Sequence, residues 1–252
     1  MCLILVAWRG HPKYPVVVAA NRDEFHARPA QPAHWWQDEP HILAGRDLSA
    51  GGTWLGLTRE GRFAALTNFR GAPRRDDAPS RGALLAGILR SPDPVSKILD
   101  HLGRVGPNYN AFNVIFSDGE RLAVYESTRG LGRELAHGIY GLSNHLLDTP
   151  WPKVENAKSS LSRALESLPD SSAALALLRD ARPAPDELLP RTGLTAQWER
   201  LMSSAFIRSD EYGTRCSTVI SIDARGAANF EEWTWDPAGL EQGKVSFEFQ
   251  TA

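Results

Sequence analysis

Residues 1–8, MCLILVAW, and residues 14–21, YPVVVAAN, are two apolar runs rich in β-branched side chains, and they decide the fold class. The short segment between them, RGHPK at 9–13, carries turn-forming residues. Apolar runs without polar alternation are typical of strands that are covered on both faces. We therefore predict that the chain opens with two neighbouring strands, joined by a tight turn, in a buried sheet.

Groups of strands alternate with groups of helices along the rest of the chain. Further strands are predicted at 51–58, 62–69, 110–117, 121–127, 138–144, 214–223, 228–235 and 244–250, and helices at 80–90, 93–104, 151–168 and 171–181. Ser80 and Asp93 are the predicted N-caps of the first two helices. This order favours helices packed outside sheets, the α+β class, over a doubly wound α/β fold.

We interpret residues 1–252 as a single domain, with the Pro-rich stretch 182–190 as the best candidate for a linker. The net charge is −2 without a basic block, which argues against a nucleic-acid partner. There is no apolar run of about 18–20 residues, which argues against integral membrane association. The start of the chain lacks the basic region of a secretory signal, so we expect a cytoplasmic protein with reduced thiols.

The cysteine and histidine patterns exclude several kinds of site. The two cysteines, Cys2 and Cys216, form no CxxC motif, so neither a disulfide framework nor a zinc site is predicted. The seven histidines show no HExxH or paired spacing, and we predict no metal site. Cys216 lies in the middle of an apolar strand and is interpreted as a buried core thiol.

Cys2 has two interpretations. Beside an apolar run it could be a buried hydrophobe like many free cysteines. If Met1 is removed, however, the residue carries both a thiol, with a reference pKa of about 8.5, and an α-amine, with a reference pKa of about 7.7–8.0. The amine could then accept the proton of its own thiol, which places nucleophile and base in one residue.

A polar cluster ends the second predicted strand. The sequence NRDEF at 21–25 gathers Asn21, Arg22, Asp23 and Glu24. If the first two strands pair as neighbours, this cluster lies near Cys2, where an aspartate could hydrogen-bond an α-amine and fix its direction. A solvated turn is the alternative interpretation.

The segments MCLI (1–4) and NRDEF (21–25) together resemble the NRDE family, which includes the eukaryotic transport and Golgi organisation 2 proteins. That family is similar to the cysteine N-terminal-nucleophile hydrolases, such as penicillin V acylase and bile-salt hydrolase. The resemblance continues in order through residues 51–71, 138–146 and 212–223. It implies a four-layer αββα fold.

The resemblance also implies roles for individual residues. Asp23 matches the aspartate that holds the α-amine, Asn68 and Asn144 match oxyanion-stabilising asparagines, and Arg215 matches an arginine near the nucleophile. Ala20 stands where the hydrolases carry an arginine, and Arg22 is the candidate replacement. The candidate catalytic residues are Cys2, Arg22, Asp23, Asn68, Asn144 and Arg215, and the candidate substrate-binding residues are Asn21, Trp54 and Thr218.

The resemblance therefore suggests that Cys2 attacks an amide or related acyl carbonyl of a small molecule and forms a thioester, without a cofactor. The alternative is a non-catalytic carrier of the same fold, for haem or for an acyl-CoA or lipid. Because one fold hosts many functions, the family resemblance leaves both open.

Overall fold

The computed structural model describes residues 2–252 and separates them into two compact units. Unit 1 consists of residues 2–27, 137–143 and 147–248, and unit 2 of residues 28–136, 144–146 and 249–252. Met1, whose removal the amine hypothesis requires, lies outside the described residues. Since the chain passes between the units several times, neither unit is one continuous segment, and the single-domain interpretation stays a prediction.

Unit 1 is built on a six-stranded sheet of order β10-β1-β2-β11-β12-β13. Its strands are β1 (Cys2–Trp8), β2 (Val16–Phe25), β10 (Gly138–Leu142), β11 (Tyr212–Ile222), β12 (Ala227–Trp235) and β13 (Glu241–Gln250). The predicted pairing of the first two strands is confirmed, because β1 and β2 are antiparallel neighbours with Cys2 opposite Arg22. The strands predicted at the end of the chain are also confirmed.

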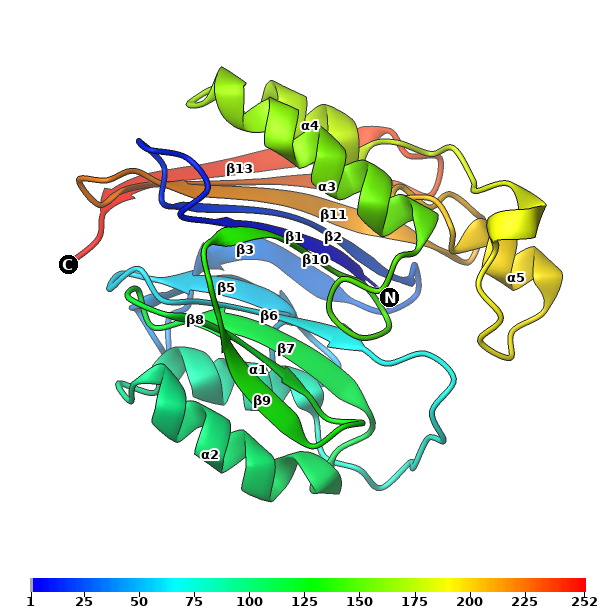
Figure 1. The fold of residues 1–252 in the computed structure, drawn as a ribbon, viewed down its shortest axis with the longest axis horizontal. Helices are drawn as coiled ribbons and strands as arrows, with labels where there is room; N and C mark the ends of the chain where they lie inside the picture. Colours follow the sequence, from blue (N-terminus) through cyan, green and yellow to red (C-terminus); the bar gives the residue numbers. More distant parts are fainter. Residues whose placement is uncertain (1) are drawn as a thin grey trace. The chain divides into compact units, whose positions relative to one another are not determined.

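The helices of unit 1 are α3 (Pro152–Ala164), α4 (Ser172–Leu178) and α5 (Ala196–Leu201), with 3-10 turns η2 (Leu165–Ser167) and η3 (Asp186–Leu188). Buried residues at helical spacing in α3, such as Val154, Ala157 and Leu161, form one core with Leu3 and Leu5 of β1. Figure 1 shows α3 and α4 along this face of the sheet. The predicted helix 151–168 ends early, because its last turn is 3-10.

The alternation of side chains along a strand fixes which face each residue of the site occupies. Leu3 faces α3, so Cys2 points to the opposite face of the sheet. Asn21 lies opposite Leu3 in the register and faces the helices, whereas Arg22 shares the face of Cys2.

Unit 2 is built on a seven-stranded sheet in which sequence order equals spatial order, from β3 to β9. The strands are β3 (Ala30–Trp35), β4 (Ile42–Asp47), β5 (Leu55–Thr58), β6 (Phe63–Asn68), β7 (Phe112–Ser117), β8 (Leu122–Glu126) and β9 (Leu131–Leu135). Two helices, α1 (Arg81–Arg90) and α2 (Val95–Val105), pack on it, and the 3-10 turn η1 (Gly106–Asn108) follows α2. The hairpin predicted at 51–69 is confirmed as β5 and β6.

Of the two N-caps predicted in unit 2, one is confirmed. The Oγ of Ser80 accepts a hydrogen bond from the N–H of Ala83 at 3.2 Å. The prediction of Asp93 as a cap was wrong, because α2 begins at Val95 and the Oδ2 of Asp118 accepts the Val95 N–H at 2.9 Å. Asp118, which is distant in sequence, thus caps the helix in place of the adjacent Asp93.

Each unit contributes one antiparallel sheet and one layer of helices, which confirms the α+β class and supplies the components of the predicted αββα architecture. Strands β3, β4 and β9 and helix α5 were not predicted. Within residues 2–252, none of the helices is long and apolar enough to cross a membrane.

Candidate active site

Three side chains form a row across the middle of the unit 1 sheet. Arg22 of β2 lies opposite Cys2 of β1 on one side and opposite Cys216 of β11 on the other. Directly opposite residues of antiparallel strands project from the same face. Arg22 is 5% exposed, so its positive charge is almost removed from water, and it lowers the pKa of both the Cys2 and the Cys216 thiol.

The environment of Cys2 acts on its thiol in both directions. Burial raises the pKa of the Cys2 thiol above its usual value, and the negative charge of Asp23 adds to this effect. A hydrogen bond from the backbone N–H of Asp23 and the positive charge of Arg22 lower the same pKa. Because the net shift is upward, the thiol is mostly protonated near neutral pH and needs a base to become a nucleophile.

The carboxyl group of Asp23 is fixed in direction by β11. The hydroxyl of Thr214 donates to its Oδ1 at 2.7 Å and accepts the N–H of Ile207 at 2.9 Å. The hydroxyl of Tyr212 donates to the carbonyl oxygen of Asp23 at 2.9 Å. These bonds hold the end of β2 and aim the carboxyl group of Asp23.

Burial raises the pKa of Asp23 above its usual range, although the positive charges of Lys153 and Arg22 and the Thr214 hydrogen bond act against the rise. Lys153 lies in the first turn of α3 and is 5% exposed. A lysine at a helix N-terminus is disfavoured by the helix dipole, and the nearby carboxylate offsets that penalty.

Arg215 occupies a β-bulge. The register of β11 against β2 shifts between Thr214 and Cys216, which leaves Arg215 as the extra residue. Its Nη1 donates to the carbonyl oxygen of Phe25 at 2.9 Å. Burial and the charge of Arg22 both lower the pKa of Arg215, so the two arginines lie close enough for their charges to interact.

Asn21 has a structural role in this arrangement. Its Nδ2 donates to the carbonyl oxygens of Leu178 at 2.7 Å and Ala205 at 2.8 Å, and its Oδ1 accepts from the Ser217 hydroxyl at 2.6 Å. Both N–H groups are therefore engaged, on the face of the sheet opposite to Cys2. The side chain ties α4 to β2 and does not face the thiol.

Thr218 lies on β11 opposite Ala20 and is 2% exposed. Its Oγ1 donates to the Oε2 of Glu232 at 3.2 Å, within the face that carries Arg22. Thr218 and Arg22 are therefore on one face of the unit 1 sheet, and the role of Thr218 in substrate binding stays a prediction.

Asn68 and Asn144 belong to unit 2 and lie close to each other. The Nδ2 of Asn144 donates to the carbonyl oxygen of Asn68 at 2.8 Å, and the carbonyl oxygen of Asn144 accepts the N–H of Arg70 at 2.8 Å. Among residues 2–252, the half-buried side-chain amide of Asn68 makes no hydrogen bond. Asn68 therefore has a free donor, while Asn144 holds the Asn68 backbone in place.

Trp54, also in unit 2, is half-buried and packs on β4. A Cβ atom at Gly45 would lie 2.4 Å from the Trp54 indole, so only glycine at position 45 allows this packing. The substrate-binding role of Trp54 stays a prediction.

Sequence reasoning missed Thr214, Lys153 and Glu232. Each is separated from Asp23 by more than a hundred residues, and only Thr214 lies in a segment, 212–223, that carries the family resemblance. A second signal was positional, because Thr214 and Glu232 fall within strands that were predicted to close the sheet.

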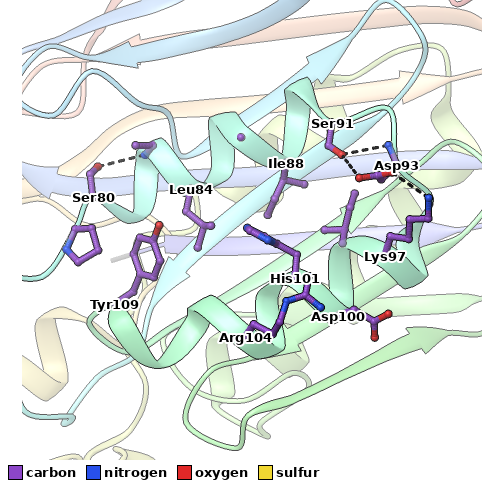
Figure 2. Close-up of a pocket in the computed structure, with 14 residues that line it drawn as sticks. Ser80, Leu84, Ile88, Ser91, Asp93, Lys97, Asp100, His101, Arg104 and Tyr109 are labelled. Carbon is purple, nitrogen blue, oxygen red and sulfur yellow. Dashed lines mark hydrogen bonds and ion pairs between the residues drawn. The ribbon is translucent and has the colours of Figure 1, made fainter.

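A second concave surface lies on unit 2, between α1 and α2, with a volume of about 700 Å³. Figure 2 shows Leu84 and Ile88 on α1 facing His101 and Arg104 on α2. A further groove of about 1150 Å³ lies on unit 1 beside α3 and α4. Neither groove is lined by Cys2, so neither is part of the candidate site.

Comparison with known proteins places the chain among relatives of nearly equal length. It is 35% identical to a Transport and Golgi organization protein 2 homolog of Bos taurus, over all of both chains, and 28% identical to Transport and Golgi organization protein 2 of Drosophila melanogaster, over 95% of each. A homolog from Mus musculus is 34% identical over 92% of each chain.

Two solved structures show weaker similarity. A mutant of conjugated bile acid hydrolase from Clostridium perfringens has a TM-score of 0.49 and 13% identity, covering 98% of this chain and 92% of its own. The N-acylethanolamine-hydrolyzing acid amidase ortholog of Caenorhabditis elegans has a TM-score of 0.42 and 11% identity, covering 87% and 92%.

The family assignment rests on the sequence comparisons. The sequence model of the Transport and Golgi organisation 2 family matches residues 1–237, which span all the candidate site residues. The family resemblance predicted from the motifs is thereby confirmed: the chain belongs to the Transport and Golgi organisation 2 family.

Proposed function

We propose that the protein is a cysteine N-terminal-nucleophile hydrolase that cleaves a C–N amide or related acyl bond of a small molecule. The observation that carries the proposal is the position of Cys2. Its thiol lies beside Arg22 and accepts the N–H of Asp23, whose carboxyl is held by Thr214. A buried carboxyl and a buried arginine next to a thiol are typical of sites that carry out chemistry.

The proposed reaction begins after removal of Met1. The α-amine of Cys2 takes the thiol proton, and the thiolate sulfur forms a bond to the acyl carbon. The protonated amine then gives its proton to the leaving nitrogen as the C–N bond breaks, which leaves a thioester. Water, deprotonated by the same amine, attacks the thioester and releases the acid and free Cys2.

Three neighbours support these steps. Asp23 accepts a hydrogen bond from the α-amine and so fixes the direction of its lone pair. Arg22 favours the thiolate, because its positive charge lowers the pKa of Cys2. Arg215 stabilises the end of β2 through the Phe25 carbonyl and adds a second positive charge to the site.

In this proposal Asn68 and Asn144 stabilise the tetrahedral oxyanion. The unengaged amide of Asn68 supports a donor role, whereas the Asn144 amide orients the Asn68 backbone. Loss of one oxyanion donor typically lowers the rate by about 10²–10³. Asn68→Ala should therefore lower kcat by about that factor with little change in KM.

The test combines mass, labelling and turnover. Intact-mass measurement of protein from cells should show that Met1 is absent, and an electrophilic acyl probe should label Cys2 and spare Cys216. Cys2→Ala should abolish hydrolysis of a panel of small amides, while Ser96→Ala, at an exposed position of α2, should leave it unchanged. Retention of Met1 in active protein would contradict the mechanism.

One observation favours the alternative, a carrier without turnover for haem or for an acyl-CoA or lipid. Burial raises the pKa of Cys2, which keeps the thiol protonated and unreactive unless an amine is present. The names of the relatives, which refer to transport and Golgi organisation, fit such a role. Equal labelling of both cysteines, together with a haem absorption shift lost in Cys2→Ala, would support the carrier.

We further propose a cytoplasmic location, because Cys2 and Cys216 are both free and not joined in a disulfide, as is usual for cytosolic proteins. Fractionation of cells that express the tagged protein tests it. Recovery in a membrane or secreted fraction would contradict it.

A further inference from the structure

A buried carboxylate, Glu232, lies on the same face of the unit 1 sheet as Arg22. Thr218 of β11 stands opposite Glu232 of β12 on one side and Ala20 of β2 on the other. This row is two residues along the strands from the row of Arg22 and Cys216. Glu232 and Arg22 are therefore diagonal neighbours on one face, separated by the strand β11.

The two charges are both removed from water. Glu232 is 2% exposed and Arg22 is 5% exposed. A buried charge without an opposite charge is strongly destabilising, whereas a buried pair with satisfied hydrogen bonds is tolerated. Opposite signs on one buried face of a sheet point to mutual compensation.

Side chains of β11 connect the two groups. Thr218 donates to the Oε2 of Glu232 at 3.2 Å. The thiol of Cys216 hydrogen-bonds the Glu232 carboxylate and also interacts with the charge of Arg22. Cys216, which stands opposite Arg22 in the register, therefore lies next to both charges.

We propose that Glu232 is a positioning residue that holds the guanidinium of Arg22 in its place beside Cys2. The inference rests on the proposed function in treating Cys2 as the reactive group. Glu232 itself touches neither substrate nor the reacting sulfur. It acts through Arg22, and the Cys216–Thr218 stretch of β11 carries the contact.

The test reads the Cys2 thiol directly and does not depend on turnover. Iodoacetamide labelling, followed by peptide mass mapping, reports Cys2 and Cys216 separately at each pH. Glu232→Gln removes the carboxylate that holds Arg22, so the guanidinium is no longer fixed beside Cys2 and the Cys2 thiolate loses part of its stabilisation. We expect labelling of Cys2 at pH 7 to become about threefold slower, and its pH profile to move to higher pH.

A double-variant cycle distinguishes positioning from a direct field effect. If Glu232 acts through Arg22, Glu232→Gln should have no effect on Cys2 labelling in an Arg22→Gln background. The double variant should also melt at a higher temperature than Arg22→Gln alone, because it no longer buries a lone carboxylate. Faster labelling of Cys2 in Glu232→Gln, or an equal change in both backgrounds, overturns the proposal, because a direct field effect of the lost negative charge gives that result.

Two further variants guard against trivial outcomes. Thr218→Val keeps every charge but removes the hydrogen bond to Glu232, and should shift Cys2 labelling in the same direction by a smaller factor. Glu231→Gln is the matched control, since Glu231 is the next residue of β12, faces the helices and pairs with Lys244 at 2.5 Å. It should leave Cys2 labelling unchanged, and an equal effect of both glutamines contradicts the proposal.

The result separates this inference from the proposed function. A cycle with the expected non-additivity, in a protein that hydrolyses no amide, supports the positioning role and counts against hydrolysis. Hydrolysis at Cys2 together with an additive cycle supports the proposed function and contradicts the positioning role of Glu232.

Discussion

Asp23 at the end of β2 and Asp118 beside the start of α2 are two carboxyl groups that the protein treats in opposite ways. Burial tends to raise the pKa of Asp118, but the backbone N–H groups of Val95, Arg121 and Glu120 outweigh it, and the pKa is lowered. Burial dominates at Asp23, and the pKa is raised.

The difference separates a carboxylate that stabilises the fold from one that does not. A lowered pKa means that the charged form is more stable in the folded protein, so Asp118 contributes stability at neutral pH. A raised pKa means that the folded state disfavours the charged form of Asp23, so this charge lowers stability. Proteins keep such groups where function requires them, which is why the Cys2 end of unit 1 is our candidate site.

The largest expected effect concerns the hydrogen bonds that support the strand next to Asp23. The Ser217 hydroxyl donates to Asn21 and accepts the Trp235 indole N–H at 2.9 Å. Ser217→Ala leaves two buried polar groups unpaired and should destabilise the protein by about 2–3 kcal/mol in urea unfolding. Ser96→Ala, at an exposed position, is the control. If Ser217→Ala loses no more stability than this control, the end of β2 does not depend on the hydrogen bonds of Ser217.

Asp118→Ala should lower the unfolding free energy by about 1 kcal/mol, the usual value of a lost helix cap. Because the pKa of Asp118 is lowered in the folded state, its contribution is present above the unfolded pKa of about 3.9 and is lost as pH falls through the folded pKa. Urea titrations at pH 7 and pH 3 measure this. Asp76→Ala, on an exposed loop, should have no effect, and a pH-independent loss at Asp118 would refute the comparison.

Asp23→Asn should stabilise the protein at pH 7 by about 0.5–1 kcal/mol, within the range of stabilising single substitutions. The pKa of Asp23 is raised, so burying its charged form costs stability, and asparagine removes this cost. The cost is absent below about pH 4, the pKa in the unfolded chain, and grows as pH rises through the folded pKa. Thermal melts across this range test the sign. If the variant is less stable than the wild type at every pH, then Asp23 stabilises the fold as Asp118 does, and the comparison is wrong.

The smallest effect is on the thiol. The charge of Asp23 raises the pKa of Cys2, so Asp23→Asn should speed iodoacetamide labelling of Cys2 at pH 7 by about twofold. Turnover should fall in the same variant, because the α-amine loses its partner. Asp118→Ala should leave labelling unchanged, and slower labelling in Asp23→Asn would be inconsistent with the electrostatics of the site.

Sequence reasoning succeeded where an element is marked by its own residues. The runs 2–8 and 14–21 predicted β1 and β2, and their pairing brought Arg22 beside Cys2. It failed at β3, where Pro32 and exposed side chains hide a strand, and at the cap of α2, where Asp118 replaces Asp93. The partners of Asp23 could not be predicted, since they reach it only through tertiary pairing.

The register of β2 against β11 has a consequence for how the chain is made. Arg22 pairs with a residue almost two hundred positions later, and β1 gains its other neighbour, β10, only from residue 138 onward. During synthesis one edge of β2 therefore stays unpaired until β11 has left the ribosome, when nearly the whole chain has been made. Contacts of such sequence separation form slowly. A ribosome that stops before residue 212 would release a chain in which the row of Cys2, Arg22 and Cys216 cannot form.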